Sequence, residues 1–265
     1  MNPSKFALTG IACLLSTAAT CMAQVSTPVI GVARLGDGSL RMVYGVPDNL
    51  IVDSQNLGRV QTASFSDTAA LVYKDGSIDL VDRKFHPVGG YSVEDPNALL
   101  NVDGDADTAI AWLPGSATIL YWNNGAFHST VVKGLEGSFE VTSLRRSGPQ
   151  AELLISDPNG PVFEGTVSIE TGELTSLIPL NGIHAPAFWA RDRILFQDVD
   201  GLAVQQPNGA VEVLPGISGN LSFARISSEW VLVTSATAKR SWVVNVSGAH
   251  VRMSELPATT AEGVR

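Results

Sequence analysis

The chain has 265 residues and a formal net charge of −9, with 26 acidic side chains against 17 lysines and arginines. Binding to nucleic acid or to anionic membranes rests on clustered Lys and Arg, so this balance argues against both as partners. The closest approach to a basic cluster is the pair Arg145 and Arg146, and a pair of this kind is typical of a solvated turn.

The first residues predict a signal peptide for export. Lys5 is the only charge before an apolar run from Phe6 to Leu15, and small residues follow up to Ala23. This layout is typical of a secretory leader, residues 1–23, that is cleaved after Ala23. The apolar run is too short to anchor the chain, because a spanning helix takes about 20 residues. We therefore expect a periplasmic or secreted protein.

Both cysteines, Cys13 and Cys21, lie in this leader. The mature chain would have none, which excludes disulfides and zinc sites built on cysteine. A lipoprotein with Cys21 as its lipid-modified first residue is the alternative, although Ala18–Thr20 is a poor lead-in for that processing. No later segment is long and apolar enough to span a bilayer, so we expect no transmembrane segment in the mature chain.

Residues 24–57 are expected to close or cover the structure that follows them. Two apolar segments, Val29–Ala33 and Leu40–Val43, flank a turn at Gly36–Ser39 and predict a hairpin. The hairpin resembles the last two strands of a larger sheet.

Residues 58–257 contain five repeats of about 40 residues. The clearest marker is a short apolar strand that follows a polar turn, and the intervals between successive copies are 39, 43, 41 and 37 residues. The five copies are Ala69–Tyr73, Ala109–Trp112, Glu152–Ile155, Arg193–Phe196 and Trp230–Val233.

An apolar strand precedes most of these copies, and two more β-like segments follow each. Four short strands per unit, separated by Gly, Asp, Asn and Pro turns, are typical of one propeller blade. Stacked blades bury each other's faces, which a single sheet cannot do alone. The sequence therefore predicts an all-β fold, a β-propeller of five or six four-stranded blades, with a two-sheet β-sandwich as the alternative. The expected inner strands are Ala63–Ser66, Val141–Leu144, Ala187–Trp189 and Leu221–Phe223.

The sequence leaves the number of blades open. Either five repeats form the ring and the hairpin covers it, or the C-terminal tail, residues 258–265, completes a sixth blade. That tail offers one poor strand at best.

The first repeat resembles those of exported bacterial propellers of the WD-repeat-like and YVTN type. The resemblance rests on Val60–Asp67 and on Ala70–Asp82, and the period extends it over most of the mature chain. The repeats lack the Gly-His start and the Trp-Asp end of eukaryotic WD repeats. The resemblance implies the propeller architecture, but these families share no single activity, so it implies no function.

One acidic segment, Asp103–Asp107, has carboxylates at alternate positions, as a calcium loop does. Thr108 stands where such a loop needs its glycine, and Pro114 stands where it needs its bidentate glutamate. We interpret the segment as a polar turn and expect no metal and no cofactor. Standard catalytic signatures are also absent from the sequence.

We expect the ligand site at the channel mouth that is rimmed by the loops entering the inner strands. These loops converge on the axis from different blades, which brings distant polar groups within reach of one ligand. Residues next to the inner-strand anchors would line the floor of the site, and arginines there are more often paired with carboxylates than free. The loops contribute Glu94, Asp95, His184 and Asn220, and the floor would contain Arg145, Trp189 and Arg225.

These observations favour a non-catalytic exported propeller that binds a protein, peptide or glycan through one loop face. The alternative is a propeller enzyme, a hydrolase or lyase, with its site at the channel mouth.

Overall fold

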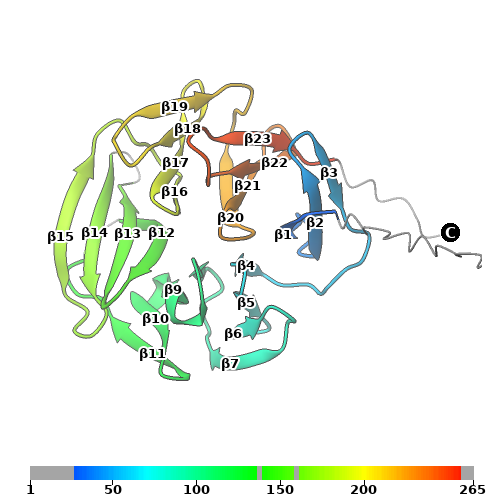
Figure 1. The fold of residues 1–265 in the computed structure, drawn as a ribbon. Helices are drawn as coiled ribbons and strands as arrows, with labels where there is room; N and C mark the ends of the chain where they lie inside the picture. Colours follow the sequence, from blue (N-terminus) through cyan, green and yellow to red (C-terminus); the bar gives the residue numbers. More distant parts are fainter. Residues whose placement is uncertain (1–26, 136–138, 158–160, 258–265) are drawn as a thin grey trace, which may run out of the picture.

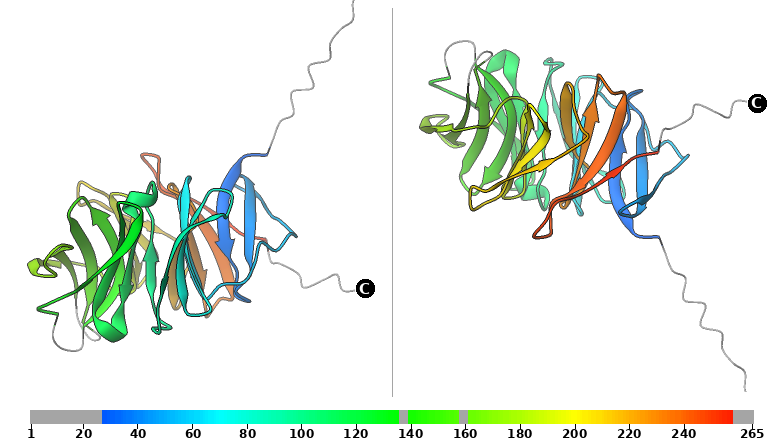
Figure 2. Two further views of the ribbon diagram at one scale, coloured as in Figure 1. Left: turned by 90° about the horizontal axis from the view of Figure 1, so that it is seen from below. Right: turned by 90° about the horizontal axis from the view of Figure 1, so that it is seen from above.

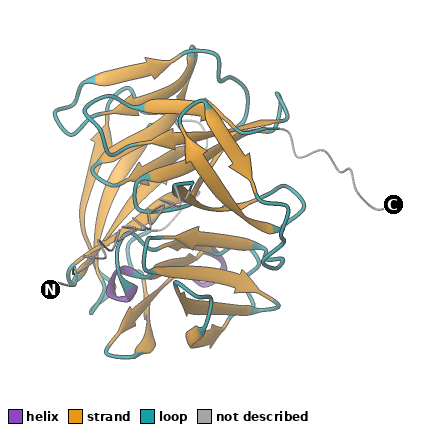
Figure 3. Ribbon diagram, turned by 45° about the vertical axis from the view of Figure 1, so that its right-hand side comes forward, coloured by secondary structure: helices purple, strands orange, loops and turns teal. Residues whose placement is uncertain are grey.

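The computed structural model describes residues 27–135, 139–157 and 161–257. The expected leader and the C-terminal tail lie outside the described residues. Within those ranges the chain forms antiparallel sheets that stand around a common axis like the blades of a propeller (Figure 1). Figure 3 shows that the only helical segments drawn are two short 3-10 turns, Ala106–Thr108 and Pro114–Ser116.

No helix among the described residues has the length and hydrophobicity needed to span a membrane.

Five of the sheets have four strands, and in each the chain runs from the strand nearest the axis outward. We number them as blades two to six. Their strands are β4 (Thr62–Phe65), β5 (Ala69–Lys74), β6 (Ser77–Asp82) and β7 (Pro87–Ser92); β8 (Leu99–Asn101), β9 (Ile110–Leu113), β10 (Thr118–Asn123) and β11 (Ala126–Val131); β12 (Glu140–Ser147), β13 (Gln150–Ser156), β14 (Val162–Ser168) and β15 (Leu174–Leu180); β16 (Ala187–Ala190), β17 (Arg193–Asp198), β18 (Gly201–Gln205) and β19 (Val211–Leu214); and β20 (Leu221–Arg225), β21 (Trp230–Ser235), β22 (Arg240–Asn245) and β23 (Arg252–Glu255).

The predicted all-β propeller is confirmed, with six blades, and the β-sandwich alternative is wrong. Each of the five repeats is one blade. The sequence missed three strands, namely β3, β7 and β8.

Blade one is a sheet of three strands, β1 (Val29–Arg34), β2 (Leu40–Val46) and β3 (Asn49–Val52). The first strand starts beside the end of β20, where the Val32 N–H donates to the Ile226 carbonyl at 3.0 Å. It ends beside the start of β4, where the Val60 N–H donates to the Gly38 carbonyl. β1 therefore runs antiparallel to the inner strands of its neighbours. The second strands of the other blades run in this same direction.

Blade one has no strand at the innermost position among the described residues. The inner strands β20 and β4 of its two neighbours lie next to each other instead, and β1 stands behind them (Figure 1). The predicted hairpin thus supplies the second and third strands of its blade, whereas the sequence suggested the last two.

Apolar side chains fill every seam between neighbouring blades. Alternation along a strand sends adjacent residues to opposite faces, so Leu153 packs against blade three while Leu154 packs against blade five. The seam between blades six and one contains Ile30 and Val43 from the first blade and Leu232 from the last. Seen from the side, the blades form a ring whose strands cross it from one face to the other (Figure 2).

Candidate functional site

The inner strands of blades two to six all run in one direction, so the ring has two distinct faces. We call the face at which these strands begin the entry face and the opposite one the exit face. The turns between first and second strands lie on the exit face, and the connections from one blade to the next lie on the entry face.

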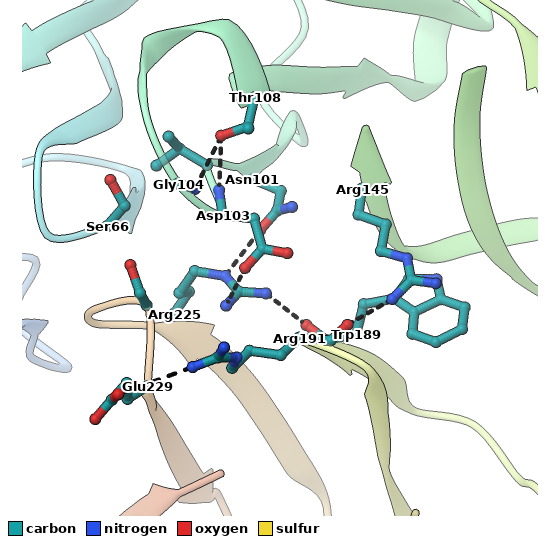
Figure 4. A network of polar contacts seen from close by, with 12 residues as sticks. Ser66, Asn101, Asp103, Gly104, Thr108, Arg145, Trp189, Arg191, Arg225 and Glu229 are labelled. Carbon is teal, nitrogen blue, oxygen red and sulfur yellow. Dashed lines mark hydrogen bonds and ion pairs between the residues drawn. The ribbon is translucent and has the colours of Figure 1, made fainter. Parts of the chain in front are cut away.

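Arg225, the last residue of inner strand β20, crosses the axis near the exit face. Its Nη1 lies 2.7 Å from Asp103 Oδ1, and its Nε donates to Asn101 Oδ1 at 3.0 Å. Its Nη2 donates to the Trp189 carbonyl at 2.9 Å. One fully buried guanidinium therefore joins blades three, five and six (Figure 4). Burial lowers the pKa of Arg225, while the Asp103 carboxylate opposes that shift.

A second guanidinium, that of Arg145, covers the buried indole of Trp189 with its central carbon 3.7 Å from the ring centroid. Arg145 also forms an ion pair with Glu152 and donates to the Arg191 carbonyl. Stacking on an aromatic face and pairing with a carboxylate together hold the side chain in one orientation.

These groups border a pocket of about 610 Å³ on the exit face. Blades two to six each contribute to it, blade four through strand β12 and the others through turns or loops, which is how a propeller assembles a site from residues far apart in sequence. The lining residues are Asp67, Asp103, Arg145, Arg191, Asp192, Ser228 and Glu229.

The turn of blade five places Arg191 and Asp192 at the rim. Arg191 has a positive φ of 60°, which is uncommon for a residue that is not glycine. Its Nη1 lies 3.8 Å from Glu229 Oε1, and both side chains are about half exposed at 48% and 49%. Solvent screens such a pair, so it holds the rim only weakly.

The sequence anticipated that the arginines near the axis would pair with carboxylates, and Arg145, Arg191 and Arg225 do so. Arg146 binds backbone carbonyls instead, including those of Asp107 and Gly148.

The residues proposed from the sequence for one site lie on two faces. Arg145, Trp189 and Arg225 gather on the exit face around the pocket. The remaining four, Glu94, Asp95, His184 and Asn220, lie in connections on the entry face. Two of these four help to hold their loops: Asp95 Oδ2 accepts from the Gly115 N–H, and the Asn220 carbonyl accepts from the Ala236 N–H.

Sequence reasoning missed several residues of the site, above all Asp103, which lines the pocket, and Asn101, which binds Arg225 beside it. Asn101 ends the three-residue strand β8, which the apolar pattern did not reveal. Asp103 follows it and was interpreted only as part of a polar turn. The repeat period contained a signal, because each of the other four repeats carries an inner strand about ten residues before its second strand ends.

The Asp103–Asp107 segment is a turn closed by Thr108. The Thr108 hydroxyl accepts from the N–H groups of Asp103 and Gly104 and donates to the Asp105 carbonyl. The Asp103 carboxylate points away from this turn toward Arg225 (Figure 4). Among the described residues, no group of three acidic, histidine or cysteine side chains is arranged to hold a metal ion.

No family model and no curated protein matches the chain. Solved structures similar to it include the WD40 domain of Toxoplasma gondii coronin, with a TM-score of 0.47 at 10% identity over 87% of this chain and 70% of that one. Hydrazine synthase of Kuenenia stuttgartiensis gives 0.47 at 12% identity over 85% and 79%. BamB from Moraxella catarrhalis gives 0.39 at 12% identity over 88% and 91%. These likenesses concern the fold alone.

Proposed function

We propose that this chain is a non-catalytic binding propeller whose exit pocket takes a basic side chain, Lys or Arg, presented by a partner protein or peptide. The charge balance of the pocket carries this proposal. Asp103 is paired with Arg225, Glu229 with Arg191, and Arg145 with Glu152 outside the lining. Two carboxylates on the pocket wall, Asp67 and Asp192, have no cationic partner among the described residues, so the pocket retains negative charge.

The positions of the paired arginines favour a single basic side chain as the ligand over a partner whose positive charge is spread across a wide surface. Arg145 and Arg225 fix the floor, while the weak Arg191–Glu229 pair at the rim is free to rearrange around a guest. An incoming ammonium or guanidinium group would bind Asp67 and Asp192 with charge-assisted hydrogen bonds. The net charge of −9 would also steer a basic partner toward the protein.

A protein or peptide fits the pocket better than a glycan does. Sugar rings are usually bound against exposed aromatic faces, and none of the lining residues is aromatic. The nearest indole, that of Trp189, is buried and covered by Arg145.

We also propose that the protein acts outside the cytoplasm, in the periplasm or after secretion. This proposal is supported by the layout of residues 1–23.

The test is titration calorimetry with matched peptides that carry a central lysine, arginine, glutamine or glutamate. We expect the basic peptides to bind and the acidic one not to bind, with affinity falling as salt rises from 50 to 500 mM. The double variant Asp67→Asn/Asp192→Asn should weaken binding at least tenfold, since it removes both free carboxylates.

The matched control is Asp200→Asn, which removes a charge from a turn on the entry face. It should leave binding unchanged. Equal affinity of the double variant and the unchanged protein would overturn the proposal. Hydrolysis of the bound peptide would replace the binding role with the enzyme alternative.

A further inference from the structure

A second cavity opens on the exit face, in the seam between blades three and four. Its volume is about 580 Å³, and we call it the seam cleft. Blade three contributes Asp107 and the end of β10, with Tyr121 and Asn123. Blade four contributes Arg146 of β12 and Glu170 of the turn that follows β14. Because it reaches the third strands of both blades, the seam cleft lies farther from the axis than the exit pocket does.

The seam cleft and the exit pocket adjoin each other across the end of β12. Consecutive residues of a strand point to opposite faces of the sheet. Arg145 lines the exit pocket and donates to the Arg191 carbonyl of blade five. Arg146 lines the seam cleft and donates to the Asp107 carbonyl of blade three. The turn after β8 also borders both cavities, because its Asp103 lines the exit pocket and its Asp107 lines the seam cleft.

The charges and the wall of the seam cleft suit a basic side chain. Asp107 and Glu170 are exposed, and neither carboxylate has a cationic partner among the described residues. Arg146 is the one cation among the described residues that line the cleft, so one negative charge remains in excess. The half-buried ring of Tyr121 forms part of the wall and offers apolar surface to the stem of a lysine or arginine.

We propose that the partner presents two basic side chains, one for the exit pocket and one for the seam cleft. This inference rests on the proposed function, because the first of these side chains is the one that the exit pocket takes. It deepens that function by defining the partner as a segment with two lysines or arginines at a fixed spacing.

The geometry of the blades sets this spacing. Tyr121 lies on the third strand of blade three, which is two strand spacings, or roughly 10 Å, outward from the inner strand β8. In an extended peptide, side chains four residues apart point the same way and lie about 13 Å apart. The flexible stems of lysine and arginine absorb the difference. A peptide with three residues between its two basic side chains therefore reaches both cavities.

Titration calorimetry with two matched peptides tests this inference. One peptide carries a single central lysine in a background of glycine and serine, and the other carries two lysines with three residues between them. We expect the second peptide to bind at least about tenfold more tightly, because its second contact forms within a complex that the first contact has already made.

The double variant Asp107→Asn/Glu170→Gln should remove this gain and leave the affinity for the single-lysine peptide unchanged. The matched control is Asp105→Asn/Glu173→Gln. It removes the same charge from the same two turns, at exposed positions that do not line the seam cleft. The control should retain the full gain from the second lysine, which separates a contact in the cleft from a general effect of charge.

The outcomes separate this inference from the proposed function. Equal affinity of the two peptides for the unchanged protein would overturn the inference, as would a loss in Asp107→Asn/Glu170→Gln no larger than in its control. The proposed function would stand in both cases, provided that Asp67→Asn/Asp192→Asn still weakens binding of the single-lysine peptide. If neither peptide binds the unchanged protein, the proposed function fails and this inference fails with it.

Discussion

Arg225 of blade six and Asp103 of blade three meet on the axis of the ring, with 2.7 Å between Nη1 and Oδ1. Their blades stand on opposite sides of the ring (Figure 1), so the contact joins the inner strands of the two blades across the central axis. The Arg225 side chain is completely buried, whereas that of Asp103 is 25% exposed.

Removal of one partner should therefore be costly. Asp103→Ala leaves a buried guanidinium without its counter-charge and should lower the free energy of unfolding by about 3 kcal/mol. Urea unfolding measures this loss. The double variant Asp103→Leu/Arg225→Met should recover much of it, because replacing a buried ion pair by apolar groups is often neutral. A double variant that is less stable than Asp103→Ala would contradict this account.

Glu164, on the third strand of blade four, should make stability depend on pH. Burial raises the pKa of its carboxyl and repulsion from Glu152 raises it further, while Arg145 lowers it. A raised pKa means that the folded state binds the proton more tightly than the unfolded state does. The ionised carboxylate therefore destabilises the fold, and this effect appears as pH rises from the ordinary value of 4.5 through the raised pKa.

Glu164→Gln should accordingly unfold at higher urea than the unchanged protein at pH 7, with the difference shrinking toward pH 4. The control Glu173→Gln, an exposed position in the same blade, should show no such trend. A difference that grows toward low pH would have the wrong sign for this explanation.

Gly31 should be essential to the seam between blades six and one. A Cβ at this position would lie 2.0 Å from the Ile226 carbonyl oxygen, closer than any real contact. Gly31→Ala should thus separate β1 from blade six and cost about 2 kcal/mol or more in unfolding free energy. Gly36→Ala is the matched control, since nothing lies within 4 Å of a Cβ there. Equal stability of the two variants would contradict this prediction, because it would show that β1 can move away from Ile226 without a loss of stability.

Export is testable directly. N-terminal sequencing of protein recovered outside the cytoplasm should begin at Gln24 if the leader is cleaved after Ala23. An intact Met1 on exported material would contradict the signal peptide, and a lipid-modified Cys21 would establish the lipoprotein alternative.

The blades could be predicted because each buried second strand is a continuous apolar segment that recurs with the period. The three-residue strand β8 could not, since Leu99–Asn101 is too short for its alternation to stand out. Asp103 was missed for a related reason, because its partner Arg225 lies in another blade, far along the chain.

The division of the proposed site between two faces has a geometric cause. His184 precedes inner strand β16 and the Arg191 turn follows it. Four residues of extended chain span about 13 Å, so side chains at the two ends of such a strand cannot meet around one small ligand. The sequence pattern predicted correctly that the entry-face and exit-face residues both lie near the axis. It did not predict that they lie at different heights along that axis.

The position of Arg225 also decides what can pass through the ring. Its guanidinium lies between the exit pocket and a small cavity of about 80 Å³ that is bordered by Leu144, Phe188 and Phe223. The Arg225 side chain therefore closes the inner end of the exit pocket, and a ligand bound in that pocket would meet a guanidinium plane rather than an open central channel.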